Sequence, residues 1–164
     1  MMRIGVLSDT HNNLPDSIPA LFDGVDLILH AGDIESPQLL MRLQKVAPVI
    51  AVRGNMDPPF TPDPLPRFRM VPLEGKRVLV THRVGNPKHP PRLLKERLQQ
   101  VRPDVVVFGH THHPCNERIG GILFFNPGTA GNMRDGRSLS VGFLEIDDGD
   151  IHGGVVYLDR HERF

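Results

Sequence analysis

The 164-residue sequence contains one cysteine, one tyrosine and no tryptophan. Because Cys115 has no second cysteine to pair with, no internal disulfide can form, and a reducing cytoplasm is the expected location. The scarcity of aromatic residues disfavours a stacking platform for single-stranded nucleic acid. No apolar run approaches the roughly 18 residues of a membrane span, and no secretory leader precedes residues 3–9, so no membrane association is expected.

The sequence also lacks an excess of charge of either sign, with 19 Lys and Arg residues against 19 Asp and Glu residues. A neutral chain has no overall field to attract a polyanion, so stable binding of duplex nucleic acid is not expected. The length suits one domain, residues 1–164, with a core large enough to fold without disulfides.

The apolar pattern of the first third predicts parallel strands separated by helices. Strands are expected at 3–9, 26–33 and 49–55, since near-continuous aliphatic runs are typical of strands covered on both faces. A helix at 16–24 has Asp16 as its expected N-cap and Gly24 as its end. A second helix at 36–46 has Ser36 as N-cap and Pro37 at its first position.

The remaining sequence predicts a second set of strands. A proline-rich loop is expected at 58–66, followed by a hairpin, a helix and four further strands. Their expected ranges are 67–73 and 77–82 for the hairpin, 91–101 for the helix, and 105–110, 122–128, 138–146 and 154–159 for the strands. The fold class is therefore α/β, with two packed mixed β-sheets flanked by helices.

Metal-binding residue types follow five of the predicted strands. Because open α/β sheets bind ligands beyond the carboxyl ends of their strands, these residues are expected to meet at one edge. Seven ligands are too many for one four-coordinate zinc and instead suit two cations, Mn²⁺ first, with Fe, Co, Ni or Zn as other choices. The set is Asp9, His11, Asp33, Asn55, His82, His110 and His112.

The segment "GHTHH" raises the question of where its three histidines point. If residues 105–110 continue as a strand, alternation places His110 and His112 on one side and turns His113 away. His113 precedes Pro114 and is expected to face solvent.

The order of these motifs resembles that of the calcineurin-like metallophosphoesterases. The matching segments are "DTH" at 9–11, "GD" at 32–33, "GN" at 54–55, the strand-end His82 and "GHTH" at 109–112. The short chain, "RGNMD" at 53–57 and "NPGT" at 126–129 are similar to the compact bacterial and archaeal phosphodiesterase branch. The resemblance covers essentially the whole chain and implies a four-layer α/β sandwich.

The resemblance also implies the roles of individual residues. Asp33 would bridge two metal ions, and a hydroxide held between them would attack phosphorus. One ion would be bound by Asp9, His11 and His112, and the other by Asn55, His82 and His110.

Two departures from the family pattern bear on the substrate. The family's His-Gly-His reads "HRV" here, which keeps His82 and introduces Arg83 either as a phosphate contact or as a solvated surface residue. Met56 stands where many relatives have a proton-donating histidine. Asn55 is a candidate substrate contact as well as a ligand, although asparagine also suits a left-handed turn.

Several neighbouring residues carry weaker expectations. His30 is expected to pack near the site and hydrogen-bond a ligand, and Asp57 either to support a ligand or to start a turn. Gly128 is expected to shape a tight turn beneath the metals. Cys115 has no histidine or acid at a spacing that indicates a nucleophile.

The preferred function is hydrolysis of small or nucleotide-like phosphodiesters. The metal edge shows no obvious cluster of cations for a dianionic monoester, and Met56 removes one proton source. The alternative is a non-catalytic scaffold resembling the retromer subunit of the same fold, and a nuclease acting on nucleic acid ends is a third possibility. A homodimer or homotetramer is expected if exposed C-terminal strands pair at their edges.

Overall fold

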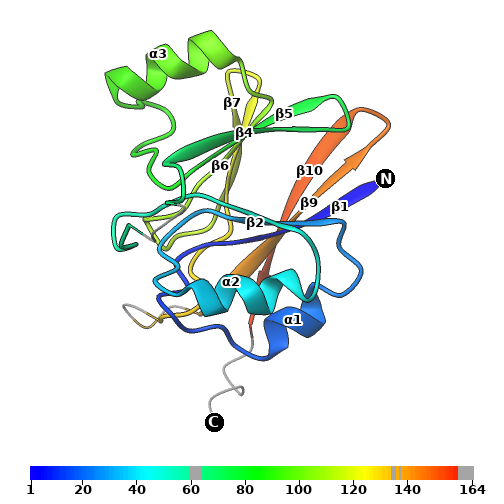
Figure 1. Ribbon diagram of the computed structural model, residues 1–164. Coiled ribbons are helices and arrows are strands. Elements are labelled where there is room, and N and C mark those ends of the chain that lie inside the picture. Colours follow the sequence, from blue (N-terminus) through cyan, green and yellow to red (C-terminus); the bar gives the residue numbers. More distant parts are fainter. Residues whose placement is uncertain (60–63, 134–135, 137, 159–164) are drawn as a thin grey trace.

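The computed structural model describes residues 1–59, 64–133, 136 and 138–158, and its main chain forms two five-stranded sheets (Figure 1). The first sheet has the order β10-β9-β1-β2-β3 and the second the order β4-β5-β6-β8-β7. The strands of the first sheet are β1 (Met2–Leu7), β2 (Leu27–His30), β3 (Val49–Ala51), β9 (Ser140–Asp147) and β10 (Asp150–Tyr157). Those of the second are β4 (Phe68–Leu73), β5 (Lys76–Thr81), β6 (Val105–Val107), β7 (Cys115–Ile119) and β8 (Ile122–Asn126).

Both sheets have a parallel centre and antiparallel additions. In the first sheet, β1 pairs parallel to β2 and β2 parallel to β3, while β9 and β10 run antiparallel. In the second, β5, β6 and β8 are parallel, with β4 and β7 antiparallel at the edges. This arrangement confirms the predicted α/β fold of two mixed sheets.

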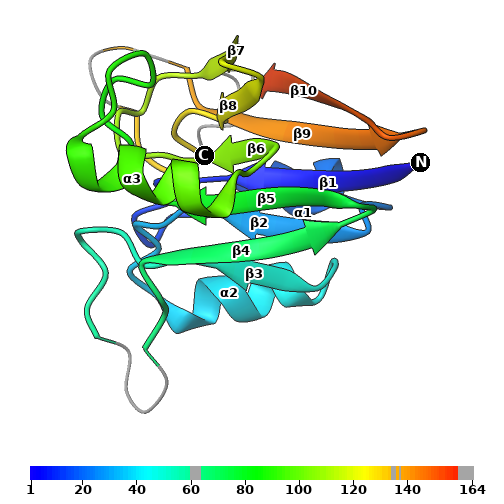
Figure 2. The same ribbon diagram turned by 90° about the horizontal axis from the view of Figure 1, so that it is seen from above.

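The helices lie outside the packed sheets and complete four layers (Figure 1). Helices α1 (Ser17–Leu21) and α2 (Pro37–Gln44) cover the first sheet, and α3 (Arg92–Val101) lies beyond the second. Seen from above, β4 and β5 cross over β1, β2 and β3 (Figure 2). The aliphatic runs are buried on both faces because one face meets the other sheet and the opposite face meets a helix.

Three apolar clusters correspond to these layers. The largest lies between the sheets and includes Val6, Leu29 and Val107, all fully buried. A second joins the first sheet to α1 and α2 through Ile18, Phe22 and other residues. The third packs Leu98 of α3 on the second sheet. The central cluster packs the two sheets against each other and so fixes the strand ends of one sheet relative to those of the other.

Both predicted N-cap residues are confirmed in position, but neither makes a side-chain capping bond. Ser36 and Asp16 occupy the N-cap positions, but neither side chain bonds to the helix backbone. The Ser36 hydroxyl instead donates to Gln38 Oε1 at 3.0 Å, and Asp16 accepts a hydrogen bond from Arg42 at 2.8 Å. Helix α1 is also shorter than the predicted 16–24, and Gly24 follows it with φ 77°.

The second half contains one strand that the sequence analysis missed. The segment "CNERI" forms β7, joined to β8 by Gly120 and Gly121, both with positive φ. Its polar composition hid it, because β7 is an edge strand with three exposed residues. The pair of glycines before an apolar run was the available signal.

Strand ends also differ from prediction at two places. Strand β10 begins at Asp150 rather than at 154, because Asp148 and Gly149 make a tight turn with positive φ after β9. Strand β6 ends at Val107, so the predicted strand 105–110 is too long. Residues 60–63 of the predicted loop and residue 159 of the last predicted strand lie outside the described residues.

Side chains of β7 bond to β10 and so join the two sheets at one edge. Asn116 donates to the carbonyl of Gly153 at 2.7 Å, and Arg118 donates to the carbonyl of Ile151 at 2.6 Å. These bonds connect the last strand of one sheet to the edge strand of the other. Among the helices described, none is long and apolar enough to cross a membrane.

Candidate metal centre

The candidate ligands follow the carboxyl ends of parallel strands in both sheets. Asp9 and His11 follow β1, Asp33 follows β2, Asn55 follows β3, His82 follows β5, and His110 and His112 follow β6. The sequence prediction that strand ends gather these residues at one edge is therefore matched by their positions. That they bind metal stays a prediction.

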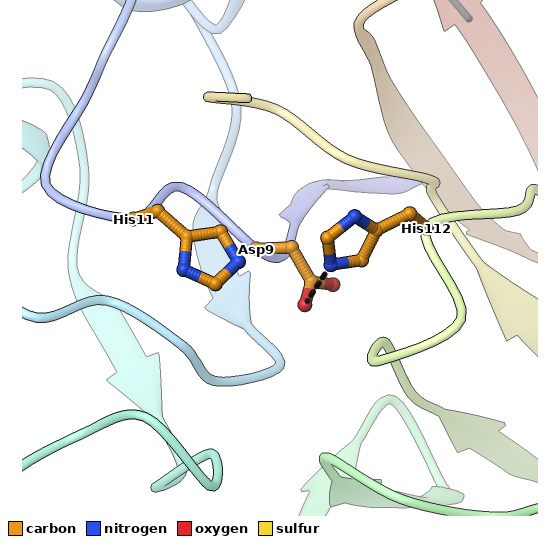
Figure 3. Close-up of side chains that lie close together, drawn as sticks. All are labelled: Asp9, His11 and His112. Carbon is orange, nitrogen blue, oxygen red and sulfur yellow. Dashed lines mark ion pairs between the residues drawn. The ribbon is translucent and has the colours of Figure 1, made fainter. Parts of the chain in front are cut away.

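The first group contains Asp9, His11 and His112 (Figure 3). Figure 3 shows the Asp9 carboxylate between the two imidazole rings, with a dashed line to His112. Oδ1 of Asp9 lies 3.2 Å from Nε2 of His112, and the two ring centroids are 5.5 Å apart. Asp9 is fully buried, so three ligand atoms converge at the base of the site.

The second group contains Asp33, His82 and His110. Nε2 of His82 is 3.3 Å from Oδ2 of Asp33, and the rings of His82 and His110 lie 5.2 Å apart. Asn55 joins this group, because its Oδ1 is 3.1 Å from Nε2 of His82. The amide oxygen, two imidazoles and a carboxylate form a donor set suited to a cation of intermediate hardness.

Asp33 stands between the two groups. Its Oδ2 lies 3.3 Å from Nε2 of His82 and 3.9 Å from Nε2 of His11. Its Oδ1 accepts the backbone N–H of Met56 at 2.8 Å. One carboxylate oxygen is thus fixed by the chain, and the other faces histidines of both groups.

Two buried atoms of the first group have no hydrogen-bond partner among the described residues. They are Oδ1 of Asp9 and Nε2 of His11. A buried carboxylate or imidazole without a partner is costly, and native proteins rarely tolerate two side by side. The residues present therefore fit a bound cation, which would use both atoms.

Contacts at the Nδ1 ring nitrogen hold two histidines in the orientation that metal binding needs. Nδ1 of His11 lies 2.6 Å from Oε1 of Glu35, and Nδ1 of His82 lies 2.7 Å from the carbonyl oxygen of Ala31. An acceptor at Nδ1 places the proton there and leaves Nε2 free as a ligand. Glu35 was missed in the sequence analysis, although its position two residues after Asp33 was a usable signal.

The loops that carry the ligands have an unusual backbone. Positive φ values occur at Asp9 (54°), His11 (46°), Asp33 (55°), His110 (69°) and His112 (60°). Left-handed conformations of non-glycine residues cost free energy and gather where a site requires them. The strand-alternation argument for His110 and His112 is therefore wrong, because both lie in a left-handed loop beyond β6. They nevertheless reach different groups, and His113 is exposed and belongs to neither.

The carboxylate of Asp57 organises two of these loops. Oδ1 accepts the N–H groups of Ile34 and Glu35, both at 2.7 Å. Oδ2 accepts those of Asp33 at 2.9 Å and Gly54 at 2.8 Å. Asp57 thus fixes the backbone that carries Asp33. Of the two predicted roles for Asp57, the structure favours support of a candidate ligand over the start of a turn.

The predicted turn at 126–129 supports the other loops. Nδ2 of Asn126 donates to the carbonyl of Gly109 and to Oγ1 of Thr111, both at 3.1 Å. The Thr129 hydroxyl donates to the carbonyl of Asp9 at 3.1 Å. Gly109 must be glycine, since a Cβ there would lie 2.6 Å from Oδ2 of Asp9. Gly128 has φ 87°, as expected for the tight turn.

His30 supports the backbone rather than a ligand side chain, which corrects the prediction. Its Nδ1 accepts the N–H of Gly32 at 3.2 Å, and its Nε2 lies 3.0 Å from Oγ1 of Thr10. Burial lowers the pKa of His30 to about 4, and nearby carboxylates only partly offset this effect. His30 is therefore neutral at neutral pH.

The carboxylates at the site are ionised at neutral pH. Burial alone would raise the pKa of Asp33, but hydrogen bonds from His82 and from the Met56 N–H lower it to about 2. Burial alone would also raise the pKa of Asp9, but the neighbouring His112 and Ser8 side chains and the charge of His82 lower it. For His82, burial is likewise outweighed by Asp33 and Asp9, which raise its pKa. The raised pKa favours the protonated form of His82, and this proton competes with a cation for the imidazole.

A cavity of about 490 Å³ opens beside the second group, and three arginines line it. They are Arg53, Arg67 and Arg83. The expectation that the metal edge lacks a cluster of cations is therefore wrong, because residues distant in sequence meet here. Arg83 also contacts the candidate ligand His110, with Nη2 3.0 Å and Nε 3.2 Å from Nε2 of that ring.

This combination of two mixed sheets and two carboxylate–histidine groups at their shared edge defines a metal-dependent phosphoesterase fold. Residues 2–149 match the family model of the calcineurin-like phosphoesterase superfamily domain, and the chain belongs to this superfamily of hydrolases. The chain is 37% identical over 162 residues to a probable metallophosphoesterase of Methanothermobacter thermautotrophicus, covering 94% of this chain and 92% of that one. It is 32% identical to the phosphodiesterase YfcE of Escherichia coli, over 90% of this chain and 89% of YfcE.

Solved structures show the same fold. An archaeal phosphodiesterase matches with a TM-score of 0.75 and 25% identity, over 94% of this chain and all of that one. Vps29 of Chaetomium thermophilum matches with a TM-score of 0.76 and 18% identity, over 96% of this chain and 97% of that one. The likeness to Vps29 concerns the fold alone.

Proposed function

We propose that the chain is a phosphodiesterase that uses two divalent metal ions. One ion would be held by Asp9, His11 and His112, and the other by Asn55, His82 and His110. The observation that carries the proposal is the position of Asp33, whose single free carboxylate oxygen faces histidines of both groups. An oxygen- and imidazole-rich donor set favours Mn²⁺, with Fe, Co, Ni or Zn as other ions of suitable chemistry.

When bound, the two ions would supply a nucleophilic hydroxide at neutral pH and stabilise negative charge on the phosphoryl oxygens. The residues of the chain fix the geometry for this chemistry. Asp57 and Asn126 hold the loops, while Glu35 and the Ala31 carbonyl orient two ligands. Asn55 is exposed at the cavity and is positioned to contact the substrate as well as a metal.

The surroundings of Met56 favour a substrate with a good leaving group. Its side chain is 55% exposed, and only its backbone N–H contacts the site, through Asp33. A thioether cannot protonate a leaving oxygen. A diester that releases an acidic alcohol or phenol needs less help than one that releases a simple alkoxide.

The test uses bis(p-nitrophenyl) phosphate as the diester and p-nitrophenyl phosphate as the monoester. Metal-stripped protein is reloaded with Mn²⁺ and assayed beside Asp33→Ala. We expect Mn²⁺-dependent diester hydrolysis that exceeds monoester hydrolysis and falls at least about 100-fold in Asp33→Ala, because both ions lose a ligand. Cys115→Ser is the matched control and should retain activity, since Cys115 lies on β7 and belongs to neither group.

The same assay separates an enzyme from a scaffold. Absence of turnover with Mn²⁺, Fe²⁺, Co²⁺ and Zn²⁺, despite two metals bound per chain, would favour the scaffold. Metal binding alone does not decide this question, because a solved structure of Vps29 from Entamoeba histolytica is a complex with zinc. A cytoplasmic location is also part of the proposal and is supported by the single cysteine.

A further inference from the structure

The cavity beside the second group is large enough for more than a phosphoryl group. Its volume of about 490 Å³ falls within the range of sites for nucleotide-sized ligands. Two candidate ligands, Asn55 and His82, are among its lining residues, so a phosphate placed at the metals would leave part of its ester arm in the cavity.

Three arginine residues from separate segments line this cavity. Arg53 follows β3, Arg67 precedes β4, and Arg83 follows β5. The backbone joins the first two segments directly, because the N–H of Arg53 donates to the carbonyl of Pro66 at 2.8 Å. The Thr81 hydroxyl donates to the carbonyl of Arg67 at 3.4 Å, which connects this segment to the end of β5.

The charge of these arginines is not matched by acids within the described part of the chain. Neither Arg53 nor Arg67 makes an ion pair there, and Arg83 contacts only the neutral acceptor on His110. Asp57 also borders the cavity, but its two oxygens are already occupied by four backbone N–H groups. Among the described residues that line the cavity, positive charge therefore exceeds negative charge.

That charge exceeds what a simple diester needs. A phosphodiester carries one negative charge, which two divalent ions held by the ionised Asp9 and Asp33 together with a hydroxide would already balance. Guanidinium groups bind phosphate through paired hydrogen bonds, and three of them in one cavity suit a second anionic group. We propose that the three-arginine cavity binds a second phosphate on one ester arm of the substrate, so that the preferred substrates are phosphodiesters of phosphorylated alcohols, such as nucleotides carrying an additional phosphate.

This inference rests on the proposed phosphodiesterase activity and is tested with two chromogenic diesters that differ in one group. They are thymidine 5′-(p-nitrophenyl phosphate) and the same compound with a 3′-phosphate. With the Mn²⁺-loaded full chain we expect kcat/KM to be roughly tenfold or more higher for the 3′-phosphorylated compound, chiefly through a lower KM. In the double variant Arg53→Gln/Arg67→Gln this ratio should fall to within about threefold of unity.

A surface charge provides the control. Arg92 lies on α3, pairs only with Glu96 and is outside the cavity. Arg92→Gln changes the net charge by the same amount per residue and should keep the wild-type ratio. If Arg92→Gln lowers the ratio as much as the double variant, the preference reflects long-range attraction and the inference is overturned.

Binding without turnover separates this inference from the proposed function. Calorimetry of the full chain, with and without Mn²⁺, should show tighter binding of thymidine 3′,5′-bisphosphate than of thymidine 5′-monophosphate, and this difference should disappear in the double variant. Turnover of both diesters at equal kcat/KM, with no preference in binding, would overturn the inference and leave the phosphodiesterase intact. Selective bisphosphate binding without hydrolysis of either diester would support the cavity and contradict the enzyme.

Discussion

The two candidate metal groups differ in how completely the chain prepares them. Asp9 and His11 of the first group present buried atoms without partners, and Glu35 orients His11. The second group opens to the arginine cavity, its His82 is bonded to Asp33 and Asn55, and its His110 contacts Arg83. In the first group a cation would replace one close contact, between Asp9 and His112, whereas in the second group it must replace contacts of both His82 and His110.

Two sites built from similar residues need not bind metal equally. Binding at the second group competes with protonation of His82, whose pKa is raised, and with the Arg83 contact of His110, and both reduce affinity. We therefore expect stepwise loading, with the first group filled before the second. The more exchangeable ion would be the one nearest the proposed substrate cavity.

The largest expected effect concerns Asp57, which supports Asp33 between the groups. Asp57→Asn replaces one acceptor oxygen by an NH₂ group that cannot accept the two backbone N–H groups it meets. We expect a loss of about 3 kcal/mol in the free energy of unfolding of the metal-free protein, measured by urea denaturation. Asp23→Asn, an exposed substitution on the first sheet's helix side, is the control. A change in Asp57→Asn no larger than in the control would contradict the role assigned to Asp57.

The next prediction concerns Glu35, which should affect metal binding at the first group only. Glu35→Gln should weaken the first bound Mn²⁺ by about 10- to 100-fold, because the amide holds His11 less firmly and donates less electron density to its ring. The second binding step should change little. Calorimetric titration of metal-stripped protein resolves the two steps, and Glu74→Gln in the β4–β5 turn serves as the control. Equal weakening of both steps would show that the groups are not independent.

A smaller effect follows from the raised pKa of His82. In the metal-free protein, protonated His82 contributes stability that is fully present below the ordinary histidine pKa of 6.5 and is lost as pH rises through the raised value. Metal binding at the second group depends on pH in the opposite direction, since it requires neutral His82. Mn²⁺ affinity at the second group should therefore rise up to about tenfold per pH unit until His82 is neutral. Titrations between pH 6 and 8.5 should show the two affinities converging; a constant ratio would refute the assignment.

The smallest effect is an increase in metal affinity. Arg83→Gln removes a positive charge near the second group and leaves the ring nitrogen of His110 free, so Mn²⁺ should bind there a few-fold more tightly. Because Arg83 is exposed, salt should reduce the difference. Arg102→Gln, at the end of α3, controls for net charge. Unchanged or weaker second-step binding in Arg83→Gln would indicate that the contact with His110 does not compete with metal.

The sequence predicts where the candidate ligands gather, because their positions depend on strand order. A buried apolar run ending in Asp, Asn or His marks a strand end, and parallel strands bring such ends together. It predicts the loops poorly, since left-handed residues such as His110 and His112 override strand alternation. The grouping of Arg53, Arg67 and Arg83 depends on how the two sheets meet, which no local pattern contains.

The bonds from β7 to β10 bear on how copies of the chain can associate. A sheet grows across a molecular boundary only where a neighbouring strand finds vacant acceptors along an edge. The carbonyls of Ile151 and Gly153 already accept side-chain donors from Arg118 and Asn116. A homodimer built as one continuous sheet through the middle of β10 would have to remove these bonds first. These two bonds therefore oppose extension of the first sheet by a second copy of the chain at β10.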